Sequence, residues 1–156
     1  MGFLSQLINS EVENYTPKYF KSYELVDKTT YQKRLDFSYQ LIDSRILWTI
    51  DKLREYFNSS IIINNWKFGG NREWSGFRTK ESPYYSPYSQ HTTGRAIDFI
   101  VRDVNSKLVR EEIKNNINKD VFKYITAIED FDGMDWAHID CRNWNKKENG
   151  LLIFNK

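Results

Sequence analysis

Hydrophobic side chains recur every three or four residues between Lys33 and Phe57. They fall on one helical face, at Leu35, Tyr39, Ile42, Ile46, Ile50, Leu53 and Phe57. This period predicts a long amphipathic helix, which the polar run Asn58-Ser59-Ser60 ends. The first thirty residues mix polar and aromatic positions and predict one short helix and a loop.

Short β-branched or alternating runs follow the predicted helix. The expected strands are Ile61–Ile63, Ala96–Arg102, Phe122–Ile128 and Trp136–Arg142. A further helix is expected from Val109 to about Asn118, and a turn around Gly133 separates the last two strands. This order predicts an α+β domain in which N-terminal helices pack on a small, mostly antiparallel sheet with one helix inserted.

Composition narrows the class of protein. The 156 residues are enough for one domain, 1–156, with a core of its own. The hydrophobic share of 40% and the charged share of 28% are typical of a globular protein. A net charge of +2 without a basic stripe gives no indication of nucleic-acid binding, and no apolar run is long enough to span a membrane. The single cysteine, Cys141, excludes an internal disulfide and a cysteine-rich zinc site.

The two histidines of the chain each lie in a polar segment. His91 lies in Ser89-Gln90-His91-Thr92-Thr93-Gly94-Arg95-Ala96-Ile97-Asp98, and His138 lies in Asp135-Trp136-Ala137-His138-Ile139-Asp140. A catalytic zinc site needs three nitrogen, sulfur or oxygen ligands and one open position, and two histidines with one aspartate meet that count. A turn at Gly94 would let His91 and Asp98 face one metal. A lone histidine is more often a hydrogen-bonded structural residue. The pattern around each histidine therefore decides whether it is interpreted as a metal ligand.

Strand alternation sorts the last predicted strand into two faces. The polar face carries Trp136, His138, Asp140 and Arg142, whereas Ala137, Ile139 and Cys141 point the other way. We therefore expect Cys141 in the core. Alternation alone directs Asp135 away from the face of His138, so it reaches the metal only if the chain bends between Asp135 and Trp136, a bend that nearby Gly133 favours. Without that bend, the alternative acids are Glu129, Asp130 and Asp132.

Three blocks in this order resemble one known family. They are Ser75-Gly76-Phe77-Arg78, then Ser89-x-His91-x-x-Gly94-x-Ala96-x-Asp98, then Trp136-x-His138-x-Asp140. Together they resemble the M15 family of zinc peptidases. That family includes D-alanyl-D-alanine carboxypeptidases and dipeptidases, and phage endolysins that cut the L-alanyl-D-glutamate bond. It shares its fold with the hedgehog signalling domain.

The resemblance implies a role for each matched residue. His91, Asp98 and His138 would be the ligands of Zn²⁺, and Asp135 would be the catalytic acid. Arg78 would bind substrate or stabilise the transition state, with a surface ion pair as the alternative. Ser89 and Asp140 would orient the ligands. Trp74, Tyr84 and Trp136 would either wall a cleft or pack in the core. Two features depart from the pattern: Asp135 is shorter than glutamate by one methylene, and the loop Thr79–Tyr88 matches no substrate-defining segment.

The resemblance also implies a substrate. We expect zinc-dependent hydrolysis of peptide bonds in bacterial peptidoglycan stem peptides by a phage-encoded cell-wall peptidase. The N-terminus shows no secretory signal, so cytoplasmic synthesis is expected, with access to the wall after lysis or as part of a phage virion. The alternative is a catalytically inactive, zinc-containing module of the same fold that binds cell wall or builds the virion. A carboxylate at Asp135 favours the enzyme.

Overall fold

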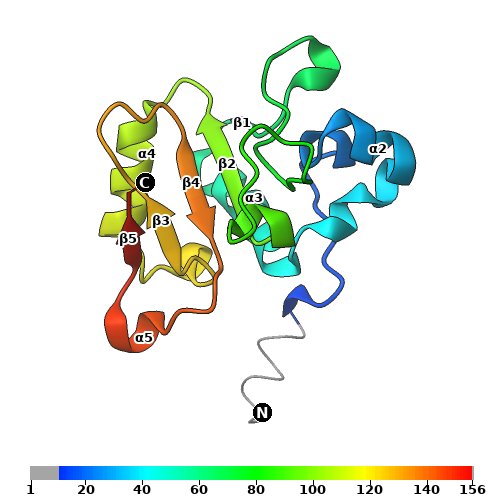
Figure 1. The fold of residues 1–156 in the computed structure, drawn as a ribbon. Coiled ribbons are helices and arrows are strands. Elements are labelled where there is room, and N and C mark those ends of the chain that lie inside the picture. Colours follow the sequence, from blue (N-terminus) through cyan, green and yellow to red (C-terminus); the bar gives the residue numbers. More distant parts are fainter. Residues whose placement is uncertain (1–10, 156) are drawn as a thin grey trace.

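A five-stranded mixed sheet forms the centre of the computed structural model, which describes residues 11–155 (Figure 1). Its strands are β1 (Ile61–Ile62), β2 (Ala96–Val101), β3 (Ala127–Glu129), β4 (Ala137–Asp140) and β5 (Leu152–Phe154). They lie in the order β1-β2-β4-β3-β5. All neighbours are antiparallel except β3 and β5, which are parallel. The α+β class and the mostly antiparallel sheet are therefore confirmed.

Helices cover one face of this sheet. The α-helices are α2 (Lys28–Arg34), α3 (Ser44–Phe57), α4 (Ser106–Asn115) and α5 (Lys146–Asn149). Short 3₁₀ turns are η1 (Ser22–Glu24), η2 (Leu35–Leu41), η3 (Trp66–Phe68), η4 (Gln90–Thr93) and η5 (Asp120–Phe122). Figure 1 shows α3 and α4 behind the sheet, and both contact β2 or β4. Within residues 11–155, no helix combines the length and hydrophobicity that crossing a membrane requires.

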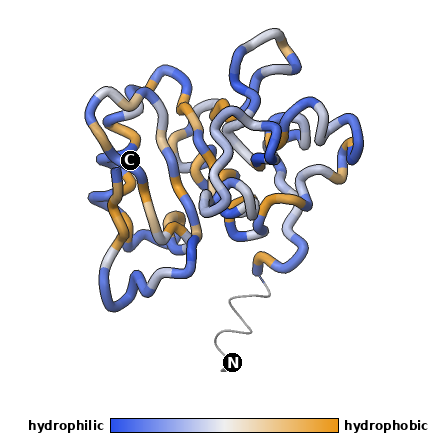
Figure 2. The backbone as a smooth tube through the Cα atoms, viewed as in Figure 1, coloured by the Kyte–Doolittle hydropathy of each residue, from blue (hydrophilic) through white to orange (hydrophobic). Residues whose placement is uncertain are grey.

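The core lies between the sheet and these two helices. Alternate residues of β2 and β4, among them Ile97 and Ile139, pack against Ile50 of α3 and Ile113 of α4. Figure 2 shows hydrophobic positions recurring along these strands and helices. Cys141 belongs to this core, as alternation predicted, and burial raises the pKa of its thiol to about 12. The cysteine is therefore a neutral packing residue.

The prediction of one helix from Lys33 to Phe57 is wrong. The segment is divided into the end of α2, the turn η2 and α3. Leu35 has a φ of 50°, and Ile42 is extended. Asp43 then starts α3, because its side chain accepts a hydrogen bond from the backbone N–H of Arg45 at 2.9 Å. The apolar period continues through the break, so periodicity alone could not reveal it.

Other boundaries also differ from the sequence predictions. The expected strand Phe122–Ile128 is wrong in its first part, where η5 ends at Phe122 and β3 begins only at Ala127. Helix α4 begins at Ser106 because the side chain of Asn105 caps it. Helix α5 and strand β5 were not predicted. Of the first thirty residues, 1–10 lie outside the described part, and the rest contain η1 and the start of α2.

Gly94 provides a test of how η4 packs on η2. It has a φ of +72°, and a Cβ atom there would lie 1.9 Å from the carbonyl oxygen of Leu41. We expect Gly94→Ala to lower the free energy of unfolding by more than about 3 kcal/mol, because a backbone clash adds to the strain of a positive φ. Denaturant unfolding would measure the change.

Gly133 is the matched control for this substitution. Its φ is +83°, but a Cβ atom there would meet nothing within 4 Å. Gly133→Ala should therefore lower the free energy of unfolding by only about 1 kcal/mol, which is the cost of the positive φ alone. Equal losses for the two variants would contradict the close contact between Gly94 and η2.

Candidate metal centre

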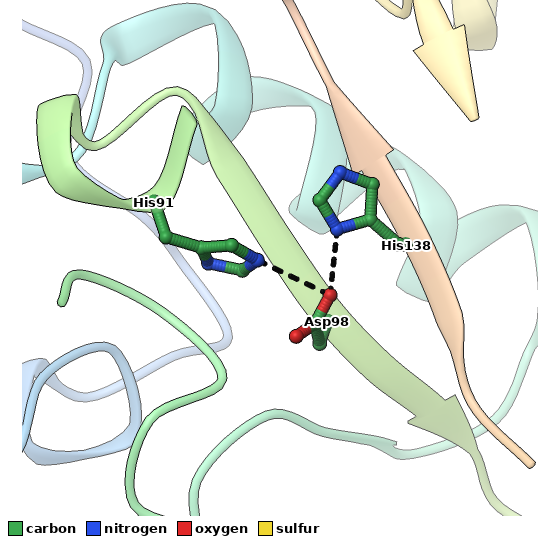
Figure 3. A group of neighbouring side chains, drawn as sticks. All are labelled: His91, Asp98 and His138. Carbon is green, nitrogen blue, oxygen red and sulfur yellow. Dashed lines mark hydrogen bonds and ion pairs between the residues drawn. The ribbon is translucent and has the colours of Figure 1, made fainter. Parts of the chain in front are cut away.

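Three elements bring the candidate ligands together. His91 comes from η4, Asp98 from β2 and His138 from β4, and Figure 3 shows the three side chains converging. Asp98 and His138 are direct partners across the β2–β4 pair, so their side chains leave the same face of the sheet. One ligand atom from each of the three residues lies within 4.8 Å of the others. The expected ligand set is thus one spatial cluster.

The hydrogen bonds of His91 fix its tautomer. Its Nδ1 lies 2.8 Å from the carbonyl oxygen of Gly76, an acceptor, so the proton is on Nδ1 and a lone pair is on Nε2. Burial lowers the pKa of His91 and favours this neutral form. Among the described residues Nε2 has no hydrogen-bond partner, although it is buried and 3.3 Å from Oδ1 of Asp98. A lone pair facing a carboxylate oxygen is unfavourable unless a cation lies between them.

His138 is held from both sides. Its Nδ1 lies 2.7 Å from Oδ1 of Asp98, and its Nε2 lies 3.1 Å from Oδ2 of Asp140. Burial opposes a charge on this ring, but the hydrogen bonds to Asp140 and Asp98 outweigh it and raise the pKa of His138 to about 9. Arg142 donates to both oxygens of Asp140, at 2.8 and 2.5 Å. Asp140 therefore orients the imidazole so that Nδ1 faces the cluster.

The two oxygens of Asp98 have different partners. Oδ1 faces both imidazoles, whereas Oδ2 accepts a hydrogen bond from Nη2 of Arg78 at 2.7 Å. Burial would raise the pKa of Asp98, but the two histidines hold it well below its usual range. Arg78 also donates from Nε to the carbonyl oxygen of Trp74, and only 15% of its side chain is exposed. Arg78 is therefore part of the cluster and not a solvated surface residue.

These donors fit a zinc ion. Two imidazole nitrogens and one carboxylate oxygen form a common catalytic zinc set, with room for a fourth ligand. The unsatisfied Nε2 of His91 independently supports a cation at this site, because a bound cation would remove the repulsion between its lone pair and the carboxylate oxygen of Asp98. His91 Nε2, Asp98 Oδ1 and His138 Nδ1 are the atoms that would hold the metal.

The cluster opens into a cavity of about 690 Å³, here called the metal-site cavity. Trp74, Tyr84 and Trp136 all line it. Of the two places considered for them from the sequence, a cleft wall or the core, the structure shows the cleft wall. The loop Thr79–Tyr88 supplies Tyr84, Ser86 and Tyr88 to the same wall. Ser89 lines the cavity too, but its Oγ accepts a hydrogen bond from the backbone N–H of His91. Ser89 thus caps η4, and the hydrogen bond that orients the imidazole is made to the carbonyl oxygen of Gly76 instead.

Asp135 lies on the wall of the metal-site cavity and is exposed. The chain bends at Trp136, beside the place where a bend is required, and the turn around Gly133, whose φ is +83°, precedes it. Asp130 is engaged in ion pairs with Arg110 and Lys114, and Asp132 does not line this cavity. Of the four candidate acids, Asp135 and Glu129 therefore line the metal-site cavity, whereas Asp130 and Asp132 do not.

A buried arginine of α4 holds the loop that carries Asp135. Nη1 of Arg110 donates to the carbonyl oxygens of Met134 and Trp136, at 3.0 and 2.9 Å, and its Nε donates to Asp130. Only 3% of Arg110 is exposed. Ser106 Oγ adds a hydrogen bond to the carbonyl oxygen of Asp135 at 2.8 Å. Arg110 could not be identified from the sequence, because nothing in the pattern of α4 distinguishes it from other charged helix residues.

Two further charged residues line the cavity: Arg72, which could not be identified from the sequence, and Glu129, which the sequence offers only as an alternative acid to Asp135. Arg72 donates to the carbonyl oxygens of Ile63 and Asp98, at 2.8 and 3.3 Å. Burial lowers the pKa of Arg72, and the carboxylates of Asp98 and Asp135 act against this shift. Both residues lie outside the three matched blocks, so only the folded chain shows that they face the site.

The fold and the cluster define a candidate metal-dependent hydrolase: a mixed sheet that presents two histidines and an aspartate to an open cavity. The sequence profile of the Peptidase M15 family matches residues 18–140, which is more than half of the chain and includes the whole cluster. The chain belongs to the M15 peptidase family. No curated protein and no solved structure gave a significant match to it.

Removing two ligands tests the metal centre. The wild-type protein should bind about one zinc ion per chain, because three ligands and one water complete a tetrahedral site. A double variant, His91→Ala with His138→Ala, should bind none. Equilibrium dialysis followed by elemental analysis measures both. Cys141→Ala is the control and should keep the zinc, because its sulfur lies in the core. Full zinc binding by the double variant would rule this centre out.

Proposed function

We propose that this protein hydrolyses peptide bonds in the stem peptides of bacterial peptidoglycan with the help of zinc. The observation that carries the proposal is the buried, unpartnered Nε2 of His91, directed with Asp98 and His138 at one point in an open cavity. Membership of the M15 peptidase family supports the reaction class. The resemblance to cell-wall peptidases of that family supports the substrate and a phage origin, as an endolysin or a virion component.

The chain would supply three ligands and two residues that orient them. His91, Asp98 and His138 would hold the zinc, and when bound it acts as a Lewis acid that activates water and polarises a carbonyl near neutral pH. Arg78 keeps Oδ2 of Asp98 turned away from the histidines. Asp140 keeps Nδ1 of His138 turned toward Asp98. Such partners of metal ligands typically change metal affinity by about 10- to 100-fold.

Asp135 would move the proton in this reaction. Its carboxylate would take a proton from the attacking water and pass it to the leaving nitrogen. Among the described residues no hydrogen bond engages this carboxylate, so it is available to the contents of the cavity. The clamp of Arg110 and Ser106 on the backbone around it supports a fixed position for the group.

A second candidate function is a zinc-containing module that binds cell wall or builds a virion without catalysis. The observation that favours it is the length of Asp135, one methylene shorter than a glutamate at the same place. Both candidates predict zinc binding, so they differ only in turnover and in the effect of removing this carboxylate.

Digestion of purified peptidoglycan separates the two candidates. The zinc-loaded protein should release soluble peptides, chelation should stop the release, and added zinc should restore it. Asp135→Asn should keep zinc binding and the melting temperature, while release falls by about a hundredfold or more because the proton acceptor is lost. Mass analysis of the fragments identifies the bond that is cut.

Asp132→Asn is the control, since Asp132 is an exposed carboxylate of the same turn that does not line the metal-site cavity. Its rate of release should match that of the wild type. Zinc-loaded protein that releases nothing from any peptidoglycan would favour the non-catalytic module.

Arg78→Lys tests the orienting role of the guanidinium. Lysine keeps the charge, but its single ammonium cannot donate to Asp98 and Trp74 with the same planar geometry. We expect zinc affinity to fall by about tenfold or more and peptide release to fall further. Competition with a fluorescent chelator measures the affinity. Arg102→Lys, at an arginine whose side chain is 69% exposed, should change neither quantity. An unchanged zinc affinity in Arg78→Lys would contradict the role.

A further inference from the structure

Four side chains form one row across the face of the sheet that carries the candidate ligands. Asp98 of β2 pairs with His138 of β4, His138 pairs with Glu129 of β3, and Glu129 pairs with Phe154 of β5. Direct cross-strand partners point to the same face of a sheet. All four residues line the metal-site cavity. Glu129 therefore lies next to a candidate ligand, on the side of the cavity closed by β5.

Glu129 is a largely buried residue whose carboxylate has no hydrogen-bond donor in the described part of the chain. Only 6% of the residue is exposed. Among residues 11–155 no hydrogen bond or ion pair engages this carboxylate, and the cavity is the space that it faces. Burying a carboxylate is unfavourable unless hydrogen bonds or an opposite charge compensate it. The hydrogen-bonding capacity of this carboxylate is therefore directed at the contents of the cavity.

Arg142 is the cation that acts on Glu129, but it is already engaged. Its Nε and Nη2 donate to the two oxygens of Asp140, and its guanidinium lies 4.5 Å from the centre of the Phe154 ring. Asp140 is the main cause of the raised pKa of Arg142, and Glu129 adds a smaller, longer-range attraction. Arg142 therefore neutralises Asp140 and leaves the hydrogen-bonding capacity of Glu129 free.

We propose that Glu129 binds a primary ammonium group of the substrate, an inference that rests on the proposed peptidase function. An ammonium supplies the two things that a carboxylate in the interior needs, a positive charge and several N–H donors. A second metal ion fits less well, because His91, Asp98 and His138 are the only group of metal-ligating side chains found among the described residues.

The spacing of the sheet places this ammonium close to the bond that is cut. Adjacent strands lie about 5 Å apart, and one residue of an extended peptide spans about 3.5 Å. Glu129 is one strand away from His138. The amine that it binds therefore belongs to a residue one or two positions from the scissile carbonyl. In a stem peptide this amine is either the α-amine of the first residue or the side-chain amine of a diamino acid.

Acetylation of the substrate tests the proposal on the wild-type protein. Four versions of one lysine-containing stem peptide are needed: both amines free, the α-amine acetylated, the side-chain amine acetylated, and both acetylated. Acetylation of the amine that Glu129 binds should raise KM by about tenfold or more, with a smaller change in kcat, because a charged hydrogen bond to the bound substrate is lost. The acetylated peptide that binds more weakly identifies which amine Glu129 binds.

Glu129→Gln should reproduce this loss on the free peptide. The substitution keeps the size of the side chain and removes its charge, so acetylation should then have little further effect. The matched control is Glu73→Gln, which makes the same change of charge in the same cavity. Glu73 already accepts a hydrogen bond from the backbone N–H of Lys28, so the control should respond to acetylation as the wild type does.

Calorimetric titration of the same peptides into chelator-treated protein adds a readout that does not depend on turnover. Weaker binding of one acetylated peptide without any cleavage by the zinc-loaded protein would support the role of Glu129 and overturn the proposed function. If cleavage and binding did not change when both amines are acetylated, the role of Glu129 would be overturned and the proposed function would stand. Equal responses of Glu129→Gln and wild type to acetylation would overturn it as well.

Discussion

The buried carboxylate of Asp98 is the group on which the site depends. A carboxylate in the interior is costly unless every oxygen has a partner, and three separate segments supply partners here. His91 and His138 face Oδ1, and Arg78 donates to Oδ2. The backbone of Asp98 is fixed as well, because its N–H donates to the carbonyl oxygen of Ser75 at 2.8 Å and its carbonyl accepts from Arg72. Strand β4, the turn η4 and the segment 72–78 all contact this one residue.

The sequence predicts the parts of the site that depend on local patterns. Strands β2 and β4 alternate clearly, and the only two histidines each lie in a distinctive polar block, whose resemblance to the M15 family indicates a candidate ligand set. The break between Leu35 and Asp43 could not be predicted, because the apolar period runs through it. It arises from long-range contacts, such as the hydrogen bond from Asp43 N–H to the carbonyl oxygen of Gly94.

Residues that act from a distance were equally hidden. Arg110 lies on a helix on the far side of the sheet, yet it fixes the loop of Asp135 through carbonyl oxygens that no motif records. Glu129 faces the cavity because β3 pairs with β4, and Phe154 closes that side because β5 joins β3 in parallel. Side chains whose role comes from strand pairing carry no mark in the sequence, because the pairing is decided by the whole chain.

The resulting cavity combines rigid and adjustable parts in a way that suits hydrolysis of a peptide. The ligands Asp98 and His138 lie on paired strands, where positions are well fixed, while Asp135 lies on a turn that is held only through its backbone. The charges are also arranged with a direction. Arg72 and Arg78 approach Asp98 from the segment 72–78, and Glu129 lies beyond His138 toward β5. Arg142 also lies at that end, over the ring of Phe154, but its donors are engaged by Asp140, so Glu129 is the carboxylate there whose hydrogen-bonding capacity the described residues leave unused.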